Sequence, residues 1–176
     1  MSLIRGFGFR RFGFRCLGFA APFCALACAL ALPAGAAVIM HKDISLDTAK
    51  TIVEGAIAAC NAKGYATSGV VVDRDGLTLV EMRGDGASPH TMENARRKAY
   101  TSVAFKQKTS DYAKKLEDPN SVVHQQVTLP NIIAIPGGVP IKIGDEIVGG
   151  VGVSGSPGVD EDCINAALDK VQDQLQ

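Results

Sequence analysis

The densest group of side chains that could bind a ligand lies between positions 83 and 100 of the chain. It contains His90, Arg83, Arg96, Arg97 and Tyr100, together with Lys98, which interrupts the apolar side of the expected helix. Imidazole or phenolate can bind iron, and guanidinium groups bind carboxylates through paired hydrogen bonds. The group therefore predicts a site for an anionic, iron-containing small molecule, with His90 as the metal ligand. The alternative is a solvated histidine beside a basic surface stripe.

Strong catalytic motifs are absent from the sequence. It has no nucleophile elbow, phosphate-binding loop, paired CxxC or HExxH. The glycine-rich segments 136–140 and 149–155 lack the spacing and the helix that a dinucleotide site needs. His41 lies just after the predicted cleavage site, and His124 lies in an irregular loop. Either could bind a metal, but most histidines in such places bind nothing. We therefore predict no catalytic residue.

The first 36 residues have the pattern of an export signal. Four arginines precede an uncharged apolar run, 16–32, and the following Pro-Ala-Gly-Ala ends in the small-x-small pattern of a cleavage site. We expect cleavage near Ala37 and a single domain, 37–176, in the periplasm or outside the cell. A retained membrane helix is the alternative, but the run of about 17 residues, which contains Pro22, is short for a bilayer. We therefore expect no stable membrane insertion.

Removal of the leader changes the charge and the cysteine content. All 18 acidic residues follow position 36 but only 14 of the 18 basic residues do, which gives a net charge of −4. A net-acidic domain has no electrostatic basis for binding nucleic acid. Two cysteines remain, Cys60 and Cys163, and an oxidising compartment favours a disulfide between them. The alternative is two unpaired buried thiols.

Periodic apolar residues predict four helices. Segment 45–64 repeats them every three or four residues, with Ser45 or Asp47 as the cap and Gly64 at the end. A second helix is expected at about 90–105 after Ser88-Pro89, and a short one from Thr109 or Ser110 to Leu116. The last begins with the acidic run at 160–162 and presents an apolar face that includes Cys163.

Five β-rich runs alternate with turn residues. They are 67–72, 77–82, 132–135, 139–143 and 146–154, and Asp75-Gly76 supplies the tight turn between the first two. Hairpin connections make neighbouring strands antiparallel, so we expect an α+β fold with a five-stranded, mainly antiparallel sheet. The first and last helices should pack together on one face, and a helical pair lies in the middle of the chain. Missing side chains at 149–155 predict a close approach by another backbone, a helix, a ligand or a second subunit.

Three segments in this order resemble the GlcG/HbpS family of haem-binding or haem-degrading domain proteins. They are 96–105 (RRKAYTSVAF), 136–141 (PGGVPI) and 146–155 (EIVGGVGVSG), and the likeness extends from about Ile44 to Leu175. The resemblance implies a compact α/β domain with a central antiparallel sheet, assembled as a homo-oligomer. It also implies haem as the cofactor, with segment 83–91 similar to exported relatives and His90 the first choice of ligand.

Function varies within that family. Some members are secreted haem-binding proteins linked to redox sensing, others are encoded near glycolate metabolism, and a related domain is attached to corrinoid adenosyltransferases. We therefore expect an exported haem carrier, scavenger or redox-sensing accessory. One alternative is a periplasmic enzyme or accessory protein for a small hydroxy acid or aldehyde, in which Arg96 or Arg97 holds a carboxylate. Another is a corrinoid-binding module.

Overall fold

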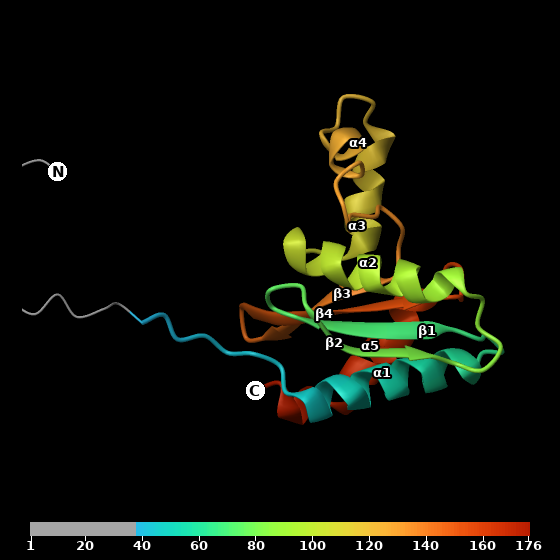
Figure 1. The fold of residues 1–176 in the computed structure, drawn as a ribbon, viewed down its shortest axis with the longest axis vertical. Helices are drawn as coiled ribbons and strands as arrows, with labels where there is room; N and C mark the ends of the chain where they lie inside the picture. Colours follow the sequence, from blue (N-terminus) through green and yellow to red (C-terminus); the bar gives the residue numbers. More distant parts are fainter. Residues whose placement is uncertain (1–37) are drawn as a thin grey trace, which may run out of the picture. The chain divides into compact units, whose positions relative to one another are not determined.

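A computed structural model describes residues 38–176 (Figure 1). The predicted export signal, 1–36, lies outside these residues. Residues Met40–Gln176 form one compact unit. Its elements in chain order are α1 (Leu46–Asn61), β1 (Ser68–Asp73), β2 (Thr78–Arg83), α2 (His90–Ala104), α3 (Thr109–Lys114), η1 (Lys115–Glu117), α4 (Val123–Gln126), β3 (Gly138–Ile143), β4 (Glu146–Ser154), α5 (Asp160–Lys170) and η2 (Gln172–Gln174).

Local sequence signals account for the first half of the unit. Ser45 caps α1, and its hydroxyl accepts a hydrogen bond from the Thr48 amide at 3.2 Å. The β1–β2 hairpin turns at Gly76, whose φ of +82° suits glycine. Asp73 closes the turn, because its Oδ1 accepts from the amides of Asp75 and Leu77. These features agree with the sequence-based prediction.

The sheet is antiparallel and has four strands in the order β2-β1-β4-β3 within the described residues. The prediction of a fifth strand at 132–135 is wrong. The backbone of this segment bonds to side chains of α2: the Ile133 amide donates to Thr101 Oγ1 at 3.0 Å, and Arg97 donates to the Ile132 carbonyl. These polar groups are therefore satisfied without a partner strand, although β-branched residues dominate the segment.

Helices cover both faces of the sheet. Figure 1 shows α1 and α5 on one face and α2 on the other. The larger core lies under α1 and α5, where Ile52, Val151 and Ile164 are fully buried. The predicted packing of the first and last helices is thus present, and Gly55 of α1 lies against Ala167 of α5.

Glycines of β4 bring α2 unusually close to the sheet. A Cβ atom at Gly152 would lie 2.0 Å from the Ala95 carbonyl oxygen, and one at Gly150 would lie 2.7 Å from the Ala99 carbonyl oxygen. Backbone therefore packs on backbone at this point, as glycine in a strand allows. Two of the predicted causes of the glycine run are present: α2 lies against Gly150 and Gly152, and other backbone lies against Gly149 and Gly155, where an added Cβ would be 2.6 Å from the Val72 and Ala66 carbonyl oxygens, respectively.

A second, smaller layer stands on α2. Helices α3 and α4 project from it on the side away from the sheet (Figure 1). Their core contains Tyr112, Val123 and Ile132, with the rings of Phe105 and Tyr112 stacked at a centroid distance of 4.4 Å. The sequence did not predict α4, which has only four residues. Across residues 38–176, no helix has the length and apolar character needed to cross a bilayer.

Candidate functional site

A cavity of about 550 Å³ lies at the N-terminal end of α2. One wall is the face of α2 that carries His90, Thr91, Asn94 and Lys98. The other walls come from the segment before β3, from the loop between β4 and α5 with its two flanking residues, and from single residues that precede β1 and α2. They contain Ala66, Ser88, Ile135, Pro136, Ser154, Gly155, Pro157, Gly158 and Asp160.

Helix geometry places the polar side chains of α2 along this cavity. His90, Asn94 and Lys98 are four residues apart, so they share one helix face. At a rise of 1.5 Å per residue, the Cα atoms of His90 and Lys98 are about 12 Å apart along the axis. His90 is exposed at the first residue of the helix, whereas Lys98 is 2% exposed. The histidine thus lies at the outer end of the wall and the lysine at its inner end.

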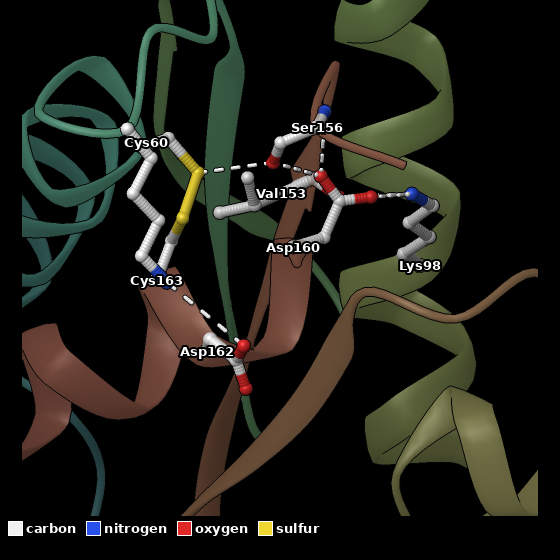
Figure 2. Close-up of a disulfide and its surroundings, with 8 residues drawn as sticks. Cys60, Lys98, Val153, Ser156, Asp160, Asp162 and Cys163 are labelled. Carbon is white, nitrogen blue, oxygen red and sulfur yellow. Dashed lines mark hydrogen bonds and ion pairs between the residues drawn. A yellow bond between two sulfur atoms is a disulfide. The ribbon is translucent and has the colours of Figure 1, made fainter. Parts of the chain in front are cut away.

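Lys98 forms a buried ion pair. Its ammonium donates to Asp160 Oδ2 at 2.8 Å and to the Val153 carbonyl oxygen at 3.0 Å (Figure 2). Both side chains lie below 10% exposure, so the pair is held in a region of low dielectric. Each charge therefore neutralises the other, and the inner end of the cavity has hydrogen-bonding groups without a net charge.

The carboxylate of Asp160 is also held from the opposite side. Its Oδ1 accepts from the Ser156 hydroxyl at 2.6 Å and from the Ser156 amide at 2.9 Å. The Ser156 Oγ lies 3.0 Å from Cys60 Sγ, and Cys60 forms a disulfide with Cys163 (Figure 2). The Cα atoms of this disulfide are 5.4 Å apart, and its ends lie on α1 and α5. A continuous chain of contacts therefore connects Lys98 with the disulfide.

The predicted arginines do not line this cavity. Arg83 is exposed at the end of β2. Arg96 donates to both carboxylate oxygens of Glu93, at 2.8 and 2.9 Å, and to Asn131 Oδ1. The Arg96 guanidinium lowers the pKa of Glu93, and the Glu93 carboxylate raises the pKa of Arg96. Arg97 donates to the Ile132 carbonyl, and its Nε is buried without a hydrogen-bond partner among residues 38–176.

Tyr100 lies elsewhere on α2. A Cβ atom at Gly76 would lie 2.8 Å from its ring, so the ring packs on the β1–β2 turn. His41 is exposed before α1, and His124 Nε2 lies 3.1 Å from the Asp118 carbonyl oxygen. Of the five predicted site residues, only His90 lines the large cavity. The part of the chain described by the structure contains no cluster of three His, Cys, Asp or Glu side chains that could hold a metal ion.

Lys98 and Asp160 were not predicted as site residues. Lys98 was assigned to a basic stripe that interrupts an apolar helix face, and Asp160 to the acidic start of the last helix. One signal was present in the sequence: Lys98 is three residues after Ala95 and next to Ala99, and both alanines are on the apolar side of the helix. A lysine at the edge of a buried face needs a partner.

The fold and the cavity define a small α+β domain in which one helix end and one sheet end enclose a binding-sized space. Residues 44–169 match the model of a family described as haem-degrading protein HbpS-like. Because the match covers more than half of the chain, the protein belongs to the HbpS-like family. The resemblance seen in the sequence is thereby confirmed, and the family relates the chain to haem.

Relatives and solved structures agree with this family. A crystal structure of HbpS has 34% identity and a TM-score of 0.70, and the match covers 76% of this chain and 94% of that one. A Streptomyces reticuli HbpS variant with two glutamates replaced by aspartate has 31% identity and a TM-score of 0.71, with 88% and 99% covered. Protein GlcG of Escherichia coli K12 is 26% identical over 111 residues, which are 63% of this chain and 81% of that protein.

A further relative is covered less completely. It is an uncharacterized 15.0 kDa protein from the dhaT-dhaS intergenic region of Citrobacter freundii, 33% identical over 86 residues. The match spans 48% of this chain and 61% of that protein. The PduOC:heme complex has the same fold, with a TM-score of 0.68 at 22% identity, and covers 73% of this chain and 94% of its own.

Proposed function

We propose that the protein is an exported haem-binding protein that acts as a carrier, a scavenger or a redox-sensing accessory. The observation that carries this proposal is the His90 imidazole on the wall of the 550 Å³ cavity in a chain of the HbpS-like family. Small-molecule sites have volumes of about 300–1,000 Å³, so the cavity has a suitable size. The heme complex of PduOC adds support, since that protein shares the fold.

The residues of the cavity fit an iron porphyrin. His90 is exposed and offers an imidazole, the commonest proximal ligand of haem iron. Ala66, Ile135, Pro136 and Pro157 supply apolar surface for the macrocycle. Iron in the bound porphyrin would supply the redox chemistry, while the protein binds and orients the group. Lys98 and Asp160 already neutralise each other, so the inner end of the cavity would offer no free counter-charge to the porphyrin carboxylates.

Export is the second part of the proposal. The arginine-rich leader and the small-x-small pattern before Ala37 support cleavage and release. The disulfide between Cys60 and Cys163 is typical of an oxidising compartment outside the cytoplasm. Fractionation of the producing cells tests this part: the processed chain should be found outside the cytoplasm. A full-length cytoplasmic chain with reduced thiols would contradict it.

A titration of the purified, oxidised protein with hemin tests the binding site. We expect a shift of the Soret band for the wild type and a weakened or altered spectrum for His90→Ala. His124→Ala is the matched control, because that histidine is exposed and does not line the cavity. No Soret shift in the wild type would refute haem binding. Equal spectra for the wild type and His90→Ala would refute the role of His90.

Two earlier expectations have less support. The hydroxy-acid alternative relied on Arg96 or Arg97 to hold a carboxylate, but Glu93 and the Ile132 carbonyl bind these guanidinium groups in the structure.

A homo-oligomer, which the family resemblance implies, stays a prediction. Light scattering of the purified protein checks it, and a monomeric mass would contradict it.

A further inference from the structure

The loop between β4 and α5 forms a large part of the cavity wall. Gly155, Pro157 and Gly158 of this loop line the cavity, as do Ser154 at the end of β4 and Asp160 at the start of α5. Gly155 and Gly158 have φ values of +126° and +82°, a region that glycine adopts without strain. A loop with two glycines needs external contacts to hold one conformation, so its contacts determine the shape of the cavity.

The disulfide lies directly behind this loop. Cys163 is on α5, three residues after Asp160, and Cys60 is on the last turn of α1. Both cysteines are fully buried, and Cys60 Sγ is 3.0 Å from Ser156 Oγ (Figure 2). The disulfide therefore joins the start of α5 to α1 and packs against the middle of the loop.

Ser156 transmits this support to the cavity. Its hydroxyl has one proton, which it donates to Asp160 Oδ1 at 2.6 Å. The oxidised Cys60 sulfur has no proton, so its contact with Ser156 in the disulfide form is a packing contact. Asp160 Oδ2 in turn accepts from Lys98 on the α2 wall. Ser156 thus connects the disulfide with the ion pair that closes the inner end of the cavity.

We propose that Ser156 and the Cys60–Cys163 disulfide are positioning elements of the ligand cavity, so that the redox state of the disulfide sets ligand affinity. This inference deepens the proposed function and rests on it. A dithiol reductant breaks the Sγ–Sγ bond by giving two electrons and two protons. Two thiols then replace the disulfide, and the reductant becomes a disulfide itself.

Reduction changes the contact chain in two ways. It removes the covalent connection between α1 and the start of α5, and it gives Cys60 an S–H group that can donate to Ser156 Oγ. The lost connection frees the loop, and the new weak donor does not replace it. Reduction therefore loosens the wall and weakens ligand binding. We expect the hemin Kd to rise roughly three- to tenfold, which is about 0.7–1.4 kcal/mol and is typical of coupling between contacting groups.

Hydrogen exchange of the purified protein tests the inference without a ligand. The backbone amides of 155–160, other than Pro157, should exchange roughly tenfold faster in Ser156→Ala, because the variant loses a hydrogen bond to a charged group, and tenfold is about 1.4 kcal/mol. A similar increase is expected for Cys60→Ala/Cys163→Ala. Ser102→Ala is the matched control: Ser102 is also buried, and its hydroxyl bonds to the Ala99 carbonyl within α2. Its substitution should leave the loop unchanged.

The combined variant separates a positioning role from general destabilisation. If Ser156 transmits the support, removal of both cysteines changes loop exchange and hemin affinity less in the Ser156→Ala background than in the wild type. Equal changes in both backgrounds, or an unchanged loop in Ser156→Ala, would overturn the inference. Ser156→Ala keeps the disulfide, so hydrogen exchange of this variant still tests the positioning role of Ser156 if the cysteine variant does not fold. A wild type that ignores hemin would refute the proposed function, while loop exchange still tests the positioning role.

Discussion

Replacement of Lys98 by methionine should cost more stability than any surface substitution in the chain. Methionine is unbranched like lysine, but it has no donor. The change leaves the buried Asp160 carboxylate without a counter-charge and the Val153 carbonyl without its donor. Loss of one partner of a buried pair costs about 3–5 kcal/mol. Asp160 keeps two hydrogen bonds from Ser156, so we expect the lower end, about 3 kcal/mol.

Chemical denaturation of the oxidised protein measures this effect, and thermal unfolding should show a drop on the order of 10 °C. Lys114→Met is the matched control, because Lys114 is 71% exposed in its pair with Asp111 and should change stability by less than about 0.5 kcal/mol. In Lys98→Met/Asp160→Asn the total loss should be smaller than the sum of the two single losses by at least about 1 kcal/mol. Additive losses, or a Lys98→Met variant as stable as Lys114→Met, would refute the buried pair.

Three other substitutions or conditions have definite expected outcomes. Gly152→Ala should lose about 3 kcal/mol or more in denaturant unfolding, because the new Cβ would lie 2.0 Å from the Ala95 carbonyl oxygen. Reduction of the Cys60–Cys163 disulfide, which spans 103 residues, should lower the unfolding free energy by up to about 4.7 kcal/mol on the chain-entropy account. Burial raises the pKa of Tyr112, so the contribution of Tyr112 to stability should be constant below about pH 10 and should be lost as the pH rises from there through the higher folded value. Denaturation at several pH values should show this alkaline loss in the wild type but a smaller one in Tyr112→Phe.

The sequence alone was sufficient to predict those elements whose structure is decided by interactions between residues close together in the chain. Ser45 before an apolar 3.6-residue repeat gave the start of α1, and Asp75-Gly76 gave the first hairpin. Segment 132–135 misled the prediction, since its isoleucines favour a strand in isolation. Its backbone partners are side chains of α2, about 30 residues earlier. No local pattern reveals such a distant partner.

The candidate site was only partly predictable for a similar reason. His90 could be selected because Ser88-Pro89 predicted a helix start at this point, and α2 begins at His90. Arg96 and Tyr100 were chosen by proximity in the sequence, but successive helical residues point in different directions, and these two lie away from the cavity. Lys98 and Asp160 are 62 positions apart, and only the crossing of α2 over the end of β4 brings them together.

The contact between α2 and the glycines of β4 has an implication for how such domains diversify. Main-chain atoms fix the height of the helix over the sheet, so side chains at the outer end of α2 do not determine it. Residues at positions such as 90 and 94 can then be exchanged without a shift of the scaffold. New ligand preferences can arise on this architecture through changes at the cavity entrance alone, while the supporting layers keep their geometry.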